Sequence, residues 1–591
     1  MSNICKEKSI FYTNHSCFIK KLRVFIQIQK YYFKPFSIKL HIFASNYNKY
    51  TTSYYNKHTA PYYNKHTTAY YNKHTMAKPA EKLAESLKVL QAIQNKGIVA
   101  IKSEDLSRTH KDRLIANGFI REVIRGWYIA VNPEENKGNS TSWFTSYWGF
   151  CSKFLEDRYG DDYCISAEQS LLLHSGNEVV PNQMIIRSVK GKNNNILLLF
   201  NTSLFCMKSP LSELEGVVVK NGLRILNLSS SIIYCSPSIF VSNPIDVRTA
   251  LSMINDASEI LGLLLDGGHS LKAGRIVGAF RNIGNSKIAD EILKTMKSAG
   301  YDVRETDPFE QKTAIPLYSR ERSPYCNRIR LMWVEMRDVV IKVFPKPSDI
   351  NLIDKATFLK NIDDIYVTDA YHSLSIEKYK VTPELIEKVK SGKWNLGDNE
   401  EDKKHRDAMA ARGYWLAFNS AKNSIEKIID GGNLGKILSE EHCDWFRELF
   451  SPSVTSGILK PSDLAGYRRH QVYIGQSLHV PVNVDAVRDV MPILFELIAE
   501  ETEASVRAVL GHFIFVYIHP YMDGNGRMGR FLMNTLLASG GYQWTVIPVQ
   551  KRDEYMNFLE MASVQQDIAP FAKFIGDLVK STMDGNPVAE L

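Results

Sequence analysis

Cysteine is scarce in this sequence, with only eight in 591 residues. The six beyond residue 100 are scattered and form no Cys-x-x-Cys pair, so neither a disulfide framework nor a zinc site is expected. No run of 18 apolar residues is present, and the stretch from 25 to 43 is broken by lysines and lacks a cleavage site. We therefore expect a cytoplasmic protein without a membrane partner.

Most of the chain has no excess of basic or acidic residues. The formal net charge is +9, but residues 1–75 contain 12 Lys and Arg residues and one acidic residue, Glu7. Residues 76–591 have 61 basic and 63 acidic residues, so the basic character belongs to the tail. With 44% hydrophobic and 23% charged residues, the chain is expected to form about three or four globular domains.

The tail, residues 1–75, has almost no glycine or leucine and contains a tandem repeat. The hexapeptide YYNKHT starts at Tyr54, Tyr62 and Tyr70, with a period of eight residues. Such a segment buries too little apolar surface to order itself, so we expect a disordered, low-complexity tail. A helical pattern follows Met76, and our hypothesis is that the native protein starts there. The alternative is a basic arm that binds nucleic acid or a membrane.

Residues 76–135 have the element order of a winged helix. Apolar residues at helical spacing come first, a short strand and a helix capped by Ser103 follow, and two short strands flank a turn at Gly126. In a DNA-binding module the second helix would enter the major groove and the wing would touch the backbone. A solvated helix face or a protein-binding module is the alternative. The residues expected at DNA are Arg108, Lys111, Arg113 and Arg125.

Residues 136–345 are expected to form an α/β regulatory domain. Strands are predicted at 183–188, 196–200 and 216–219, and helices at 244–264, 270–281 and 285–299. The winged start, CISAEQSLLLHSG and LNLSSSIIYCSPSIFVSNPIDVRTAL together resemble the abortive-infection antitoxin regulators of the AbiEi type, over about residues 80–305. This resemblance implies a transcriptional autorepressor or antitoxin role and includes no catalytic motif.

The stretch that indicates chemistry is HPYMDGNGRMGR, from His519 to Arg530. Upstream, apolar residues at helical spacing predict a core helix, which Pro520 ends at His519. Downstream, GRMGRFLMNTLLASGG predicts a second helix that ends at two glycines. We therefore expect His519 in a loop between two buried helices.

The middle of this stretch has the features of an anion cradle. Gly524, Asn525 and Gly526 allow backbone angles that point successive N–H groups inward, and the next helix adds the positive end of its dipole. Arg527 and Arg530 are three residues apart and are expected to bind the same polyphosphate.

Two further residues complete the predicted chemistry. Asp523 is a hard oxygen ligand suited to a Mg²⁺ ion that keeps most of its waters and bridges phosphates. His519 is able to accept the proton of a hydroxyl group as that hydroxyl attacks phosphorus.

Together these twelve residues resemble the Fic-domain signature HPFx(D/E)GNGRxxR, with Tyr521 in place of Phe. The resemblance implies an all-α Fic fold over about residues 350–585. It also implies transfer of AMP from ATP to a Ser, Thr or Tyr hydroxyl of a protein target, with diphosphate as leaving group. His519 would be the general base and Asp523 the Mg²⁺ ligand. The implied ATP-binding residues are Asp523, Gly524, Asn525, Gly526, Arg527, Arg530, Tyr555 and Ser563.

Two neighbouring segments resemble other parts of the family. GQSLHVPVNVDAV resembles the flap, a short hairpin that aligns the target by strand addition, with Leu478, His479 and Val480 nearest to the target. RDEYMNFLEMAS resembles the helix that covers the adenine, with Tyr555 as a base or ribose contact. Ser563 stands where the family often has Asn, which leaves the choice of nucleotide open.

SLSIE, from Ser373 to Glu377, resembles the inhibitory motif (S/T)xxxE(G/N) of Fic proteins that carry their own inhibitor. The resemblance implies that the Glu377 carboxylate pairs with Arg530 in place of the γ-phosphate of ATP. Lys378 stands where Gly or Asn is usual, so the end of this helix is expected to differ.

We therefore expect a multidomain protein with a winged helix, an α/β regulatory domain and an all-α Fic adenylyltransferase inhibited by Glu377. Two alternatives remain open. One is a DNA-binding transcriptional regulator whose Fic half senses nucleotide, and the other is a Fic enzyme that removes AMP or transfers UMP or phosphate. A DNA operator as partner and a homodimer also remain open.

Overall fold

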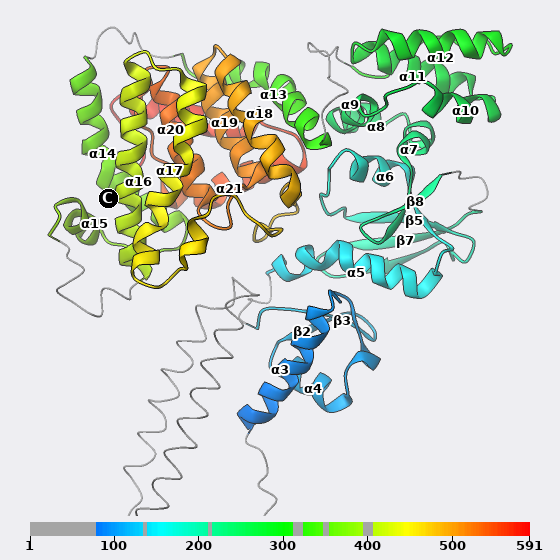
Figure 1. The fold of residues 1–591 in the computed structure, drawn as a ribbon, viewed down its shortest axis with the longest axis horizontal. Coiled ribbons are helices and arrows are strands. Elements are labelled where there is room, and N and C mark those ends of the chain that lie inside the picture. The colour runs from blue at the N-terminus through cyan, green and yellow to red at the C-terminus, as the bar shows by residue number, and fades with distance from the viewer. Residues whose placement is uncertain (1–78, 134–138, 211–215, 311–322, 347–353, 394–405) are drawn as a thin grey trace, which may run out of the picture. The chain divides into compact units, whose positions relative to one another are not determined.

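The computed structural model describes residues 79–133, 139–210, 216–310, 323–346, 354–393 and 406–591 (Figure 1). The tail and Met76 lie outside these residues. The described chain forms two compact units: residues 79–97, 102–121 and 130–133 make up one, and residues 98–101, 122–129 and 139–591 the other. None of the described helices has the length and apolar character that a membrane crossing requires.

The first elements follow the expected order of helix, strand, helix and two strands. They are α3 (Pro79–Asn95), β1 (Ile101–Lys102), α4 (Arg108–Ala116), β2 (Ile120–Ile124) and β3 (Trp127–Ala130), with sheet order β1-β3-β2. The cap of α4 is Ser107, whose hydroxyl accepts a hydrogen bond from the His110 N–H at 3.3 Å. Ser103, the expected cap, instead opens a short 3-10 helix, and its hydroxyl accepts from Lys111 at 2.6 Å.

The four basic residues expected at DNA differ in their surroundings. Arg113 donates to the carbonyl of Lys82 at 2.6 Å and so joins α4 to α3. Lys111 is held by its serine partner, whereas Arg108 and Arg125 are exposed. Arg108 Nε also lies 3.7 Å from the Asp112 carboxylate, so three of the four side chains have contacts within the protein. Both the winged-helix assignment and DNA binding stay predictions.

Residues 139–310 combine small sheets with helices, as expected. The sheets have the orders β4-β5-β7-β6 and β8-β9, and β5 pairs with β7 in parallel. The elements are α5 (Thr141–Tyr159), β4 (Cys164–Ile165), α6 (Ala167–His174), β5 (Gln183–Ser188), β6 (Asn194–Leu197), β7 (Ser203–Lys208), β8 (Val217–Lys220), β9 (Leu223–Leu226), α7 (Leu228–Tyr234), α8 (Ile239–Ser242), α9 (Pro244–Ser252), α10 (Ser258–Asp266), α11 (Ser270–Asn282) and α12 (Ser286–Ser298).

The strand predicted at 183–188 is confirmed, while the strand predicted at 196–200 begins earlier, at Asn194. The single helix predicted over 244–264 is wrong, because α9 and α10 are separate helices. Asp256 lies in the break, and its carboxylate accepts from the Ser258 N–H at 2.8 Å. Such a local side-chain bond offers the backbone an alternative to continuing the helix.

The C-terminal part is all-helical among the residues described beyond 323, as expected. Its helices are α13 (Pro324–Val343), α14 (Lys355–Ile376), α15 (Pro383–Lys390), α16 (Arg406–Ile429), α17 (Leu434–Thr455), α18 (Val487–Glu500), α19 (Ala504–Ile518), α20 (Asn525–Ala538), α21 (Arg552–Val564) and α22 (Ala569–Met583). Helices α16 and α17 lie side by side, and α19 packs on α20 (Figure 1). Because α19 and α20 are almost wholly buried, the loop between them is fixed from both ends.

Buried apolar residues form two main clusters, one within residues 164–309 and the other mostly within 325–589. Helix α13 belongs to the second cluster, where it contacts α18, α19 and α22. It precedes residue 345, the expected end of the regulatory domain. The apolar face of α13 therefore extends the C-terminal core further toward the N-terminus than the sequence indicated.

A buried ion pair joins α9 to α13. Arg328 contacts the carboxylate of Asp246, and the two side chains are 1% and 0% exposed. Arg328 Nε also donates to the Tyr517 hydroxyl in α19 at 2.8 Å. Asp246 accepts from three uncharged side chains as well, at 2.9 to 3.1 Å. Both buried charges are thus compensated, and removing one of them would leave the other without its partner.

We predict that Asp246→Ala lowers the free energy of unfolding by roughly 3 to 5 kcal/mol, because it leaves a buried guanidinium without its counter-charge. Urea unfolding followed by circular dichroism measures the change. Asp161→Ala is the matched control, since that carboxylate is 96% exposed and pairs with Arg224 at the surface, so its loss should change little. Equal effects of the two substitutions would contradict the prediction.

Candidate active site

His519 follows the last residue of α19, as predicted, and adopts a left-handed conformation with φ of 55°. Its N–H donates to the Phe515 carbonyl at 3.0 Å, and ring Nδ1 lies 3.1 Å from the Val516 carbonyl oxygen. A carbonyl only accepts, so Nδ1 carries the proton and Nε2 presents its lone pair. A positive φ at a residue other than glycine is strained and typical of functional sites.

The imidazole of His519 is held neutral. Burial lowers its pKa to about 4, although the Val516 carbonyl, Glu377 and Asp523 act in the opposite direction. Arg468 fixes the loop, because its Nε donates to the His519 carbonyl at 2.9 Å and its backbone N–H donates to the next carbonyl at 2.8 Å.

The loop then turns into the N-terminus of α20. Gly524 has φ of 85°, and a Cβ at this position would lie 2.8 Å from the ring of Phe450, so only glycine fits. The side chain of Asn525 braces the loop, because it accepts from the Tyr521 N–H at 2.9 Å and donates to the Tyr521 carbonyl at 2.8 Å. The contribution of Asn525 to an anion cradle therefore rests on its backbone alone.

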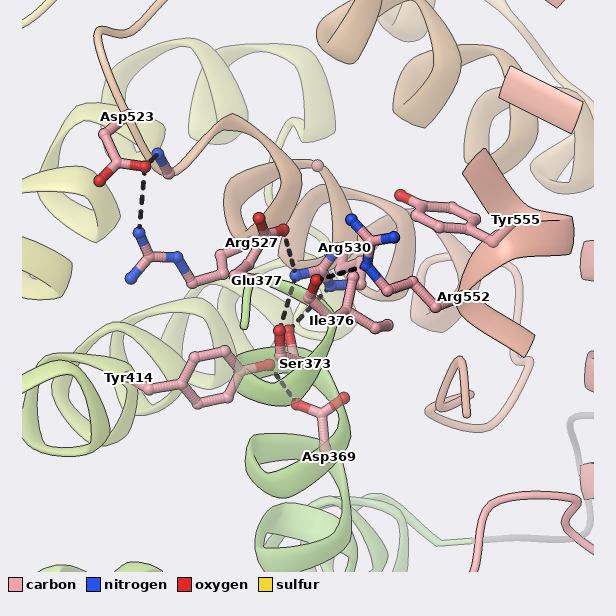
Figure 2. Close-up of polar contacts among 12 residues, drawn as sticks. Asp369, Ser373, Ile376, Glu377, Tyr414, Asp523, Arg527, Arg530, Arg552 and Tyr555 are labelled. Carbon is pink, nitrogen blue, oxygen red and sulfur yellow. Dashed lines mark hydrogen bonds and ion pairs between the residues drawn. The ribbon is translucent and has the colours of Figure 1, made fainter. Parts of the chain in front are cut away.

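Glu377 and Ser373 meet Arg530 at the N-terminus of α20 (Figure 2). Glu377 Oε1 accepts from Arg530 Nη2 at 2.9 Å, and a Cβ on Gly526 would lie only 2.3 Å from the same oxygen. Ser373 accepts from Arg530 twice, through its hydroxyl at 2.8 Å and its carbonyl at 3.0 Å. The sequence prediction that Glu377 pairs with Arg530 thus describes a contact that is present.

Arg530 is 3% exposed. Burial alone would lower its pKa, but the Glu377 carboxylate together with Tyr555 and Tyr414 acts in the opposite direction, and the pKa of Arg530 is raised. Its Nη1 has no hydrogen-bond partner among the described residues, and this atom lies 3.3 Å from where a Cβ of Gly526 would be. A buried donor without an acceptor beside a helix N-terminus favours the binding of an anion there.

Arg527, expected to bind the same polyphosphate, has a different environment. Its guanidinium lies over the rings of Tyr379 and Phe450, about 5 Å from each centroid. One Nη atom is 3.5 Å from the Asp523 carboxylate, and Nε has no partner among the described residues. Arg527 and Arg530 therefore share a helix but not a ligand in this conformation.

Helix α14 ends at Ile376 and Glu377 is its C-cap, although the next residue is not glycine. Lys378 adopts φ of 65°, a left-handed conformation that Gly or Asn takes more easily. The N–H of Tyr379 donates to a carbonyl of the preceding turn at 3.1 Å, and Arg552 Nε donates to the Ile376 carbonyl at 2.8 Å. These contacts satisfy the carbonyls at the helix end and hold Glu377 in place.

Asp369 anchors the same helix two turns before Glu377 (Figure 2). Its carboxylate is 3% exposed and accepts from the Tyr414 hydroxyl at 2.6 Å. Burial raises the pKa of Asp369 to about 6. Sequence reasoning missed this residue, and the available signal was its position four residues before Ser373 on one helix face.

Asp523, the predicted Mg²⁺ ligand, is exposed beside the cradle, and its Oδ1 accepts from the Gly524 N–H at 2.6 Å. No group of three or more His, Cys, Asp or Glu side chains able to hold a metal occurs in the described part of the chain. A lone carboxylate nevertheless fits Mg²⁺, which usually takes one or two carboxylates together with phosphate oxygens and waters.

Tyr555 and Ser563 both lie on α21 and are buried. The Tyr555 hydroxyl donates to His512 Nε2 at 2.9 Å, because His512 Nδ1 donates to the Gly529 carbonyl at 2.8 Å. Burial raises the pKa of Tyr555 to about 12. His512, which sequence reasoning missed, thus joins α21 to α20, and nucleotide contacts by Tyr555 and Ser563 stay predictions.

The hairpin predicted for the flap is wrong, because no strand occurs within residues 471–483. A side chain satisfies the backbone there, since the Leu478 N–H donates to the Glu560 carboxylate at 2.7 Å. His479 is 3% exposed, stacks on Tyr517 with 4.1 Å between ring centroids, and donates to the Tyr517 carbonyl at 2.9 Å. Val480 is also buried, so neither of these two side chains faces a target in this conformation.

Comparisons with known proteins locate one family in the chain. Residues 439–537 match the model of the Fic/DOC family. The protein adenylyltransferase Fic of Drosophila willistoni is 39% identical over 132 residues, which cover 22% of this chain and 26% of that protein. The protein of the same name in Drosophila melanogaster is 30% identical over 225 residues, 37% of this chain and 42% of that protein.

Among solved structures, Fic-1 (residues 134–508) of C. elegans is 16% identical, with a TM-score of 0.34, over 58% of this chain and 87% of that chain. The chain spans less than half the length of the curated relatives named above. The match to the Fic/DOC family model includes the signature at the end of α19. The C-terminal half of the chain therefore contains a Fic domain.

Proposed function

We propose that this chain transfers AMP from ATP to a hydroxyl side chain of a protein, and that Glu377 inhibits the transfer. The observation that carries the proposal is the Glu377 carboxylate, which sits on Arg530 at the N-terminus of α20 beside a neutral imidazole. An anion of the chain itself thus fills a site suited to phosphate. The similarity to proteins named adenylyltransferases supports the type of reaction.

The reaction requires one proton acceptor and several groups that bind phosphate. Nε2 of His519 takes the proton of the target hydroxyl, whose oxygen forms a bond to the α-phosphorus of ATP. The bond from the α-phosphorus to the bridging oxygen breaks, and diphosphate leaves with the electron pair. The amides from Gly524 to Gly526 bind phosphate oxygens, so catalysis depends on position and charge. Mg²⁺ at Asp523 would neutralise negative charge on the phosphates.

Inhibition follows from competition for one guanidinium. Glu377 and the terminal phosphate of ATP are both anions that would bind Arg530. While Glu377 is in place, ATP binds without its terminal phosphate on Arg530, and the α-phosphorus is then displaced from His519. Removal of the carboxylate frees Arg530 for the nucleotide.

Glu377→Gly should raise the rate of AMP transfer about 10- to 100-fold, as expected for loss of a charge-assisted hydrogen bond of about 1.5 to 3 kcal/mol. Intact-mass spectrometry of the variant in Mg·ATP, with and without a cell lysate, measures the transfer. Glu377→Gln is the matched control, because it keeps the size of the side chain but removes the charge, and an intermediate rate is expected. An unchanged rate in folded Glu377→Gly would refute the inhibitory role.

His519→Ala in the Glu377→Gly background should lower the rate about 10²- to 10⁴-fold, the usual contribution of a general base. Mg·ATP should bind both proteins equally well in calorimetry, since the imidazole is not a phosphate ligand. Label should enter protein from α-labelled ATP and not from γ-labelled ATP. Incorporation of the γ label would instead favour phosphate transfer.

The pH dependence should reflect the lowered pKa of His519, about 4. A histidine with the ordinary pKa of 6.5 would lose about tenfold in rate one unit below it, because protonation removes the base. For Glu377→Gly we expect no such decline between pH 7.5 and 5.5, provided circular dichroism shows the same fold at both ends. A tenfold fall centred near pH 6.5 would contradict the lowered pKa of His519.

A further inference from the structure

The flap is covered by main chain and side chains from the N-terminal half of the same compact unit. The Val180 N–H donates to the Leu478 carbonyl at 3.2 Å. The Gln476 N–H donates to the Thr141 hydroxyl at 3.2 Å, and a Cβ on Gly475 would lie 3.5 Å from that same oxygen. The Leu478 N–H already donates to a glutamate of α21, so both of its backbone groups are occupied.

The segment that reaches Leu478 is held rigidly. Residues 177–180 form an irregular connection between α6 and β5, and the Val180 side chain is 1% exposed. Trp148 Nε1 donates to the Glu178 carbonyl at 2.9 Å, and Asn177 Nδ2 donates to Asp246 at 3.1 Å. The Val180 N–H is therefore presented to the flap by a backbone that is fixed on both sides.

We propose that residues 177–180, together with Thr141, occupy the flap position at which the main chain of the protein target binds. The inference rests on the proposed function and adds a second control to it. Strand addition uses the main-chain groups of the flap, and here the Leu478 carbonyl and the Gln476 N–H are taken by the chain itself. The Val180 N–H is a main-chain donor on the Leu478 carbonyl, which is the kind of group that a target segment bound by strand addition would supply.

This cover acts on the target, whereas Glu377 acts on the nucleotide. None of the cover residues touches Arg530 or the N-terminus of α20 in a described contact. Moving residues 177–180 away should therefore improve transfer to protein without changing the affinity for Mg·ATP. Locking them in place should have the opposite effect on transfer and likewise none on nucleotide binding.

A reversible disulfide tests the cover. Thr141→Cys and Gly475→Cys, combined with Glu377→Gly, place one sulfur near the position of the Thr141 hydroxyl oxygen, which lies 3.5 Å from where a Cβ of residue 475 would be. Oxidation should lower incorporation of label from α-labelled ATP into lysate proteins at least tenfold, leave Mg·ATP binding unchanged, and be reversed by reduction. Glu377→Gly alone, oxidised and reduced in the same way, controls for the native cysteines.

Three outcomes would overturn the cover. Equal incorporation in the oxidised and reduced forms would show that target access does not need the flap to be free, and weaker Mg·ATP binding would place the effect at the nucleotide. Failure of the two cysteines to cross-link would contradict the contact itself. If Glu377→Gly alone transfers nothing, the proposed function fails first, and the inference fails with it.

A pair of substitutions at Val180 tests the single hydrogen bond. In the Glu377→Gly background Val180→Pro removes the N–H donor, and we expect transfer to lysate proteins to rise about three- to tenfold. Val180→Ala keeps the donor and removes only side-chain packing, so it should raise transfer less. Proteins whose thermal unfolding matches the parent are compared, and an equal or larger effect of Val180→Ala would argue against the bond.

Discussion

The site depends on one buried guanidinium. Arg530 is almost wholly removed from water, and a charge in that position needs an anionic partner nearby. Glu377 supplies the anion, and the dipole of α20 favours the same charge at the same place. This requirement couples α14 to α20 across 153 residues of sequence. Any ligand that releases α14 from this site has to bring comparable negative charge with it.

The same physical effect, removal from water, acts on the protonation states of His519 and Arg530. Desolvation acts on both side chains: it lowers the pKa of His519 to about 4, so the ring loses its proton, while Arg530 keeps its proton and pairs with Glu377. The site thus contains a neutral base and a fixed cation. That separation of charge states is what a proton acceptor beside a polyphosphate requires.

Local constraints explain what the sequence could predict. Pro520 restricts the residue before it, and Gly524 is needed where φ is positive, so the loop between two helices followed from neighbouring residues alone. The pair of Glu377 with Arg530 came only from a family resemblance, because no spacing rule joins residues so far apart. The residues that tertiary packing brings together, such as His512 and Asp369, gave no signal of comparable strength.

The flap was predicted least well, because its hydrogen-bond partners come from neighbouring helices that pack against it. A hairpin there would have satisfied its own backbone, but the free carbonyl at the end of α19 draws in the His479 ring instead. Glu560 takes the Leu478 N–H in the same way. The spacing of apolar residues in the sequence does not indicate that a neighbouring helix offers a better hydrogen-bond partner than the opposite strand of a hairpin.

Asp246 connects the N-terminal half to both sides of the site. It accepts from Asn177, the first residue of the segment that covers the flap, and it neutralises Arg328. Arg328 in turn donates to Tyr517, on whose ring His479 stacks. A shift of α9 would therefore reach the flap by two routes that begin at one carboxylate. Because each contact is buried, the two routes are expected to move together rather than singly.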